Sequence, residues 1–389
     1  MRMEIASPGS PAASGTGRLP ERGDSLLLYC TRLSVARGRS ERKIRRAERI
    51  PKQMRLCWKV WVVAAFVLVL GALPPASRAA SSASCTTEAE LLAPDRNALA
   101  AAGGRLTEAV MGQDYAALQA ALLPAEAAEW EGIREAVEQA APLMKGGQIQ
   151  LRNVYLLEAS SLAAPADTQF FCSNQSGSIT VTINMRALPP GRYAVVLADA
   201  AGAPLGGQLG LILAWYGAGG SEGWKLAGLS ARQGIFDGHD GKWYWTHARE
   251  LASADQPWSA WYCYEAARFL SLPVDFLSSP NMERLNQEQS QIKGSPQDAF
   301  PYSLPDGDRT WKIDAVRLDA SLREPDLGVT YESAGVTDPA AARTEAVAVL
   351  SALLKAQPGL RENFHGLWAY AVRDGKRTPV IELPMGQIP

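Results

Sequence analysis

An apolar run that lies well inside the chain limits how much of the sequence can fold as an exported domain. The run covers residues 60–73, and a short segment with two basic residues, 54–59, precedes it. Two prolines and several small residues follow, and a signal peptidase would cut this stretch most readily after Ala79. This order of basic, apolar and small residues is typical of a secretory leader. We therefore expect residues 54–79 to be a signal peptide, and the residues after Ala79 to fold after export.

A membrane anchor is the alternative interpretation of residues 60–73. The run has 14 residues, fewer than the roughly 20 that a helix needs to span a bilayer. Residues 1–53 are rich in Arg, Gly, Ser and Pro and have no sustained hydrophobic period. They are expected to be a non-native or disordered basic extension ahead of a true start at Met54. If the run is an anchor, they form a basic cytoplasmic tail instead.

Removing the leader would leave an acidic protein. Residues 1–79 carry a net charge of +10, so with −1 for the whole chain the remainder carries −11. An acidic protein repels phosphate backbones, so nucleic-acid binding is not expected.

Three cysteines follow the leader: Cys85, Cys172 and Cys263. An odd number in an exported protein suggests one disulfide and one unpaired thiol. Cys172 lies in a strand-like run, whereas Cys263 lies in an aromatic helical segment where a buried thiol is usual. A Cys85–Cys172 disulfide is the prediction. The alternative is that Cys85 is a lipidated N-terminus, although Ser82 stands where such sites normally have leucine.

The hydrophobic period changes from helical to strand-like near residue 148. Apolar residues recur at helical spacing around Leu99–Val110, after Asp114, and from Trp130 to a predicted end before Pro142. Six strand-like runs follow at residues 148–157, 168–171, 178–183, 192–197, 208–216 and 224–229. Their short connections predict an antiparallel sheet.

Two sequence segments within this part, at residues 111–124 and 223–228, are similar to segments of NTF2-like (cystatin-like) domains. The resemblance covers about residues 95–232 and implies a cone, in which helices pack into the concave side of a curved sheet. Enzymes of that superfamily place a His/Asp or Asp/Tyr pair in the cone, and this segment has no histidine. The resemblance therefore implies an apolar pocket, or a cone filled by side chains.

The rest of the chain divides into a helical segment and a second α+β unit. Residues 235–296 predict three helices, and a loop rich in Gly, Ser, Pro and Asp covers residues 294–308. Strands at 310–318 and 327–331, a helix after Asp338, and a hairpin at 365–383 predict a ββαββ unit. The expected fold class is α+β, with an NTF2-like domain at 80–234, the helical segment at 235–296 and a C-terminal α+β domain at 297–389.

Two motifs could carry chemistry. Asp237, His239, Asp240 and His247 form the densest group of possible metal ligands, but Asp-Gly-His-Asp-Gly is also ordinary turn and helix-cap chemistry. The structural turn is the preferred interpretation, and no metal site is predicted. Residues 219–223 match the G-x-S-x-G pattern of nucleophilic serines. They lie in a glycine-rich connection between two strands rather than in the strand-to-helix turn that this chemistry needs.

These observations favour an exported, non-catalytic accessory or binding protein of a bacterial envelope, periplasmic or secreted, without a cofactor. Its expected partner is a small apolar ligand or an envelope protein. Contact with a membrane would come only through the leader, an uncleaved anchor at 60–73, or a lipid on Cys85. The alternative is an exported hydrolase or isomerase with a site near Asp237, His239 and His247.

Overall fold

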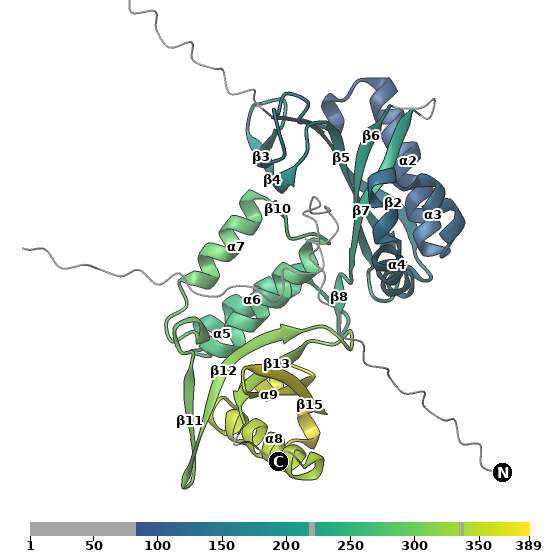
Figure 1. Cartoon of the computed structure of the whole chain (residues 1–389). Coiled ribbons are helices and arrows are strands. Elements are labelled where there is room, and N and C mark those ends of the chain that lie inside the picture. The colour runs from purple at the N-terminus through teal and green to yellow at the C-terminus, as the bar shows by residue number, and fades with distance from the viewer. Residues whose placement is uncertain (1–82, 218–221, 334, 336–337) are drawn as a thin grey trace, which may run out of the picture.

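The computed structural model describes residues 83–217, 222–333, 335 and 338–389. The leader, the basic extension and most of the G-x-S-x-G segment lie outside these residues. The described part of the chain is an α+β protein with eight α-helices and four sheets. Its N-terminal sheet and C-terminal sheet lie at opposite ends, with three helices between them (Figure 1). No helix in the described ranges is long and apolar enough to cross a membrane.

The N-terminal part contains a five-stranded antiparallel sheet with one helical face. Its strand order is β1 (Ser84–Thr87), β2 (Gln148–Glu158), β5 (Arg192–Ala201), β6 (Gln208–Tyr216) and β7 (Gly223–Arg232). The helices α2 (Ala93–Met111), α3 (Tyr115–Ala121) and α4 (Trp130–Met144) lie on one side of this sheet (Figure 1). Val154 and Val196 face these helices, whereas their neighbours Tyr155 and Val195 face the other side. This alternation is the period of two that a sheet covered on both faces requires.

The hairpin of β3 (Ala166–Ser173) and β4 (Ile179–Leu188) leaves the main sheet and covers its second face. It pairs with β10 (Leu277–Ser278) in a separate sheet of order β10-β4-β3. The expectation that all six strands follow one another in a single sheet is therefore wrong. Because β5 is apolar on both faces, it needs a cover on each side, and the hairpin supplies the second cover.

The predicted disulfide is confirmed. Cys85 of β1 is bonded to Cys172 of β3, with their Cα atoms 4.9 Å apart, and Cys263 is a buried free thiol. The bond ties the edge strand of the main sheet to the covering hairpin. It also occupies the Cys85 sulfur, to which a lipid anchor would have to be attached.

One predicted helix end is wrong, because α4 continues through Pro142 to Met144. A proline in the last turn removes one hydrogen bond from the helix. Leu143 and Met144 beyond it are buried, and Met144 joins the core between the helices and the sheet. Their burial offsets the missing hydrogen bond.

The helical segment has three helices, as predicted: α5 (Gly241–Ser253), α6 (Pro257–Ser271) and α7 (Pro280–Ser290). The Asp240 carboxylate accepts a hydrogen bond from the Trp243 N–H at 2.8 Å, and the Ser279 hydroxyl accepts one from the Met282 N–H. These side chains satisfy N–H groups that the first turn of a helix leaves unpaired.

The C-terminal sheet has five strands, one more than the predicted ββαββ unit. Its order is β11 (Tyr302–Asp306), β12 (Arg309–Asp319), β13 (Asp326–Glu332), β14 (Gly366–Arg373) and β15 (Lys376–Pro384). The helices α8 (Pro339–Ala356) and α9 (Leu360–Asn363) connect β13 to β14, which run parallel. β11 lies in the segment expected to be a loop. It is an edge strand, where Pro305 is tolerated because one side of the strand needs no partner.

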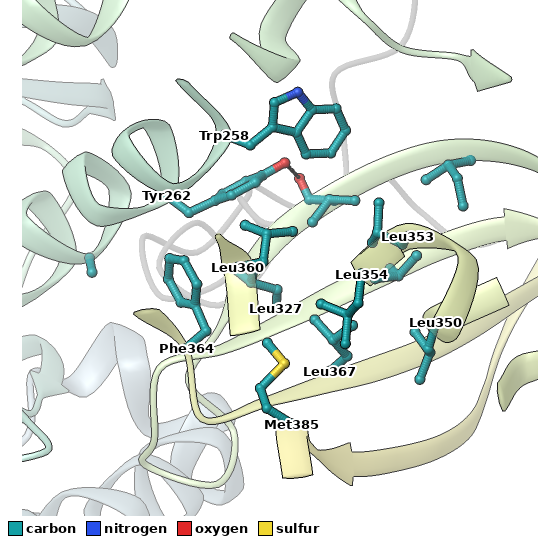
Figure 2. Close-up of a cluster of buried hydrophobic side chains, with 14 of the residues drawn as sticks. Trp258, Tyr262, Leu327, Leu350, Leu353, Leu354, Leu360, Phe364, Leu367 and Met385 are labelled. Carbon is teal, nitrogen blue, oxygen red and sulfur yellow. Dashed lines mark hydrogen bonds between the residues drawn. The ribbon is translucent and has the colours of Figure 1, made fainter. Parts of the chain in front are cut away.

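The helical segment and the C-terminal sheet share one hydrophobic core. Figure 2 shows Trp258 and Tyr262 of α6 beside Leu327, Phe364 and other side chains of the C-terminal part. The Tyr262 hydroxyl donates a hydrogen bond to the Val316 carbonyl of β12 at 3.2 Å. These two parts of the chain are therefore packed as one unit.

The Glu288 carboxylate of α7 joins all three helices of the segment. It accepts hydrogen bonds from Arg249 and Trp245 of α5, from Arg284 of α7, and from Tyr264 of α6, at 2.7–3.3 Å. The hydrogen bond from Arg249 is the largest of the effects that lower the pKa of Glu288 to about 2.

This carboxylate gives the first prediction. The folded pKa lies below the ordinary value of 4.5, so the stabilisation is complete above pH 4.5 and is lost as the pH falls toward 2. We expect Glu288→Gln to lower the free energy of unfolding by about 1–2 kcal/mol at pH 7. The difference from the unmodified chain should shrink between pH 5 and pH 2. Urea unfolding across this range measures it, and a constant difference would contradict the ionic origin.

Candidate functional site

The four predicted metal candidates lie where the short strands β8 (Ile235–Phe236) and β9 (His239–Asp240) lead into α5. Asp237 sits in the turn between these strands with a φ of 45°. Asp240 is the N-cap of α5 and bonds the Trp243 N–H. The Trp243 ring stacks on His239 with centroids 3.7 Å apart and on His247 with centroids 4.7 Å apart. The indole therefore contacts both histidine rings that the sequence pattern grouped as ligands.

Both ring nitrogens of His247 have partners. Nε2 lies 2.7 Å from Oδ1 of Asn363 in α9, and Nδ1 lies 3.3 Å from the Glu250 carboxylate. The contact with Asn363 links α5 to the C-terminal part. The geometry of Asp240, Trp243 and His247 therefore matches helix capping and packing, in line with the turn and helix-cap interpretation of this motif.

A cavity of about 920 Å³ lies between the N-terminal part, the helical segment and the C-terminal sheet. Its walls come from β4, β7, α6, α7, β12 and the connection that precedes β10, and these elements can be followed in Figure 1. Binding sites for small molecules commonly occur where domains meet, with volumes of roughly 300–1,000 Å³. Both the position and the size of this cavity suit an organic ligand.

Four arginines line this interdomain pocket, each from a different element: Arg186 of β4, Arg232 of β7, Arg268 of α6 and Arg317 of β12. Arg232 is paired with Asp275 at 2.7 Å, and Arg268 with Glu265 at 2.6 Å. Arg186 and Arg317 form no ion pair with any residue that the structure describes. Two guanidinium groups at the pocket are therefore available for an anion.

Apolar side chains share the remaining walls of the pocket with polar ones. The apolar ones include Trp261, Leu272, Val274, Leu277 and Met282. Apolar side chains beside charged groups are typical of sites that bind a molecule with a hydrophobic body and one polar end.

A second cluster combines one histidine with two carboxylates at one end of the C-terminal sheet. Asp326 begins β13, His365 directly precedes β14, and Glu382 lies near the end of β15. Their potential ligand atoms all lie within 4.8 Å of one another, the one such group of three found among the described residues. His365 Nδ1 lies 2.8 Å from Asp326 Oδ1.

Burial and charge act on the titration of this cluster. The pKa of His365 is raised, chiefly by its hydrogen bond with Asp326. The pKa of Glu382 is also raised, first by burial and then by the negative charge of Asp326. The charge of Asp326 thus disfavours the ionised form of Glu382, and a positive charge between the two side chains would relieve this repulsion.

Neither the arginines of the pocket nor this cluster stood out in the sequence. Asp326, His365 and Glu382 are far apart along the chain, and only the parallel pairing of β13 with β14 brings the first two together. The one available signal was the position of His365 immediately before an apolar strand. Which strand ends lie together at the edge of a sheet can be inferred only when the strand order is known. Here the order depends on the crossover from β13 to β14, which local sequence patterns do not reveal.

The sheet face beneath α2, α3 and α4 is filled by side chains. Leu99, Val110, Leu118, Ile133 and Val137 of the helices are all buried against the sheet.

No family model, curated protein or solved structure matches this chain.

Proposed function

We propose that this chain is an exported, non-catalytic binding protein that holds an amphipathic organic anion in the interdomain pocket. The observation that carries the proposal is the cavity of about 920 Å³ at the junction of three parts of the chain, with four arginines on its walls. Arg186 and Arg317 would meet the anionic group, and the apolar side chains of the lining would contact the hydrophobic body. A guanidinium binds carboxylate or phosphate oxygens through paired hydrogen bonds, which gives direction as well as affinity.

The local charge supports this choice of ligand. Three acidic side chains, Glu265, Asp275 and Glu283, also line the pocket. The first two are paired with arginines, and Glu283 bonds the Ser278 hydroxyl. The walls therefore carry one more positive than negative charge, within an exported part that is strongly acidic overall.

The same groups favour binding over acid–base catalysis. Arginine stays protonated in proteins and cannot donate or take a proton in a reaction near neutral pH. Asp275 and Glu265 are already engaged in ion pairs with Arg232 and Arg268. Charge recognition is the chemistry that this set of residues performs best.

The N-terminal domain is, in this proposal, an NTF2-like module that acts as a scaffold. The packing of α2, α3 and α4 on one face of the main sheet supports this relationship. Side chains fill that face, so the ligand is placed between the domains rather than inside the cone. An envelope protein as the partner is the alternative, and it is an outcome of the test below.

Export is the second element of the proposal. The disulfide between Cys85 and Cys172 supports it, because disulfides persist in oxidising compartments and are rare in the cytosol of most organisms. A leader at 54–79 that is cut after Ala79 would make Cys85 the sixth residue of the mature chain.

Decanoate binding to the full chain tests the proposed ligand class. Calorimetry and intrinsic tryptophan fluorescence measure it. We expect saturable binding of one decanoate per chain. The Arg186→Gln/Arg317→Gln variant should bind about tenfold more weakly, a loss of about 1.4 kcal/mol, because it lacks both guanidinium groups that would meet the carboxylate. Neutral decanol should be affected little by these substitutions. Arg343→Gln, an exposed residue of α8, is the matched control and should bind normally.

Two results would count against the proposal. One is the absence of saturable decanoate binding. The other is equal loss in the Arg343→Gln control, which would indicate a general charge effect. A third result would favour the partner-binding alternative over the small-molecule proposal: the chain does not bind decanoate but forms a stable complex with a protein from its host's envelope fraction.

A further inference from the structure

Three elements converge at the Asp326–His365–Glu382 cluster, which does not line the interdomain pocket. β13 and β14 are parallel neighbours, with Leu327 opposite Leu367, so the start of each strand lies at the same edge of the sheet. β15 returns antiparallel to β14 and places Glu382 opposite Trp368. The backbone pairing therefore fixes the position of all three side chains.

The Asp326 carboxylate is completely buried but only half satisfied. Its relative exposure is 0%. Oδ1 is bonded to His365, whereas Oδ2 has no hydrogen-bond partner among the described residues. A buried charged oxygen without a partner is costly, so its presence calls for a binding partner that the chain itself does not supply.

Glu382 adds a second unsatisfied oxygen close to the Asp326 carboxylate. Its Oε1 is buried and has no hydrogen-bond partner in the described part of the chain. A Cβ added to Gly366 would lie 3.0 Å from Oδ1 of Asp326 and 3.0 Å from Oε1 of Glu382. The two carboxylates thus approach the same backbone position from different strands, and glycine at 366 leaves room between them.

We propose that Asp326, His365 and Glu382 bind a divalent transition-metal ion, for which Zn²⁺ is the best fit. Zinc takes imidazole nitrogen and carboxylate oxygen at about 2.0–2.2 Å, which places neighbouring ligands roughly 3.3 Å apart in a tetrahedron. His365 Nδ1 and Asp326 Oδ1 lie 2.8 Å apart in a hydrogen bond, so zinc would displace the proton between them and the two atoms would separate by about 0.5 Å. An ion there would balance both carboxylates and would give the Oε1 atom of Glu382 a partner that it otherwise lacks.

The three ligands would leave one coordination position open. The His365 side chain is 42% exposed, so water can reach the ion from that side. Sites with three protein ligands and one water are typical of zinc that activates a bound water, whereas structural zinc sites have four protein ligands. Mg²⁺ prefers an all-oxygen, octahedral set and fits this cluster less well.

The test uses the full chain after treatment with EDTA, titrated with ZnSO₄ alone by calorimetry and checked by elemental analysis. We expect one equivalent of zinc per chain. At a zinc concentration 100 times the dissociation constant, the unfolding equilibrium constant should fall about 100-fold. MgCl₂ at the same concentration should have no comparable effect.

The three histidines of the chain supply matched variants. His365→Ala and, separately, Glu382→Gln should weaken zinc binding by more than about 100-fold, because loss of outer-shell partners alone costs about 10–100-fold. His239→Ala/His247→Ala should bind zinc normally. Circular dichroism shows whether each variant is folded, and Glu382→Gln keeps the side-chain volume in case His365→Ala does not fold.

Three results would overturn the proposal. The first is the absence of stoichiometric zinc binding. The second is unchanged zinc binding by His365→Ala and Glu382→Gln. The third is loss of zinc from the His239→Ala/His247→Ala variant alone, which would move the metal to the turn before α5.

Discussion

Replacing both Cys85 and Cys172 by serine is expected to lower the free energy of unfolding by about 4 kcal/mol. The disulfide joins residues separated by 87 positions, so it removes a large amount of conformational freedom from the unfolded chain. Cys172 is fully buried, and a serine there would also place a hydroxyl in the core between the main sheet and the β3–β4 hairpin. Both effects act in the same direction.

Urea unfolding, followed by fluorescence under non-reducing conditions, measures the change. Adding dithiothreitol to the unmodified chain should reproduce most of the loss, whereas the same treatment should leave the double variant unchanged. Cys263→Ala is the control, because this buried thiol forms no disulfide. A loss below about 1 kcal/mol in the double variant, well under the usual 2–4 kcal/mol, would indicate that this bond contributes little to stability.

Local patterns predicted most of the elements. The long apolar runs in β5 and β6 and the helical period in α2 each extend over nine or more residues. Helix starts were equally clear where a side chain caps the first turn, as at Asp114 and Asp338, which bond the N–H groups of Ala117 and Ala341. Local periodicity and caps depend on neighbours in sequence, so the sequence alone reveals them.

Long-range pairing was beyond reach of these patterns. Nothing in the local sequence of residues 166–188 distinguishes a hairpin that extends the main sheet from one that folds over its face. The strand at residues 302–306 was not predicted, because glycine- and proline-rich sequence surrounds it. Gly307 lies in the turn between β11 and β12. The disulfide could be predicted because three cysteines leave few pairings.

The candidate sites depended entirely on such long-range pairing. The interdomain pocket takes arginines from residues 186 to 317, and the proposed metal site spans residues 326 to 382. In contrast, Asp237, His239 and Asp240 were conspicuous because they are close in sequence. Proximity along the chain is a poor guide to chemistry when a tryptophan stacks beside the histidines, as Trp243 does here.

The second large effect concerns Tyr262, which joins α6 to the C-terminal sheet. Its side chain is 1% exposed, its ring meets Phe364 edge-on at 6.2 Å, and its hydroxyl bonds the Val316 carbonyl. We expect Tyr262→Ala to lower the free energy of unfolding by about 3–5 kcal/mol, as for other large aromatic side chains removed from a core. Tyr262→Phe keeps the ring and should cost only about 1 kcal/mol, the value of one hydrogen bond.

Amide hydrogen exchange measured by segment then tests whether the helical segment and the C-terminal sheet unfold as one unit. Because both contribute to the core around Tyr262, the alanine variant should accelerate exchange in α5, α6, β12, β13 and α8 together. The α2 and β5 segments belong to a different core and should change much less. Faster exchange confined to α6 would show that the helices are a separately folded insert, and that the walls of the interdomain pocket can move independently of one another.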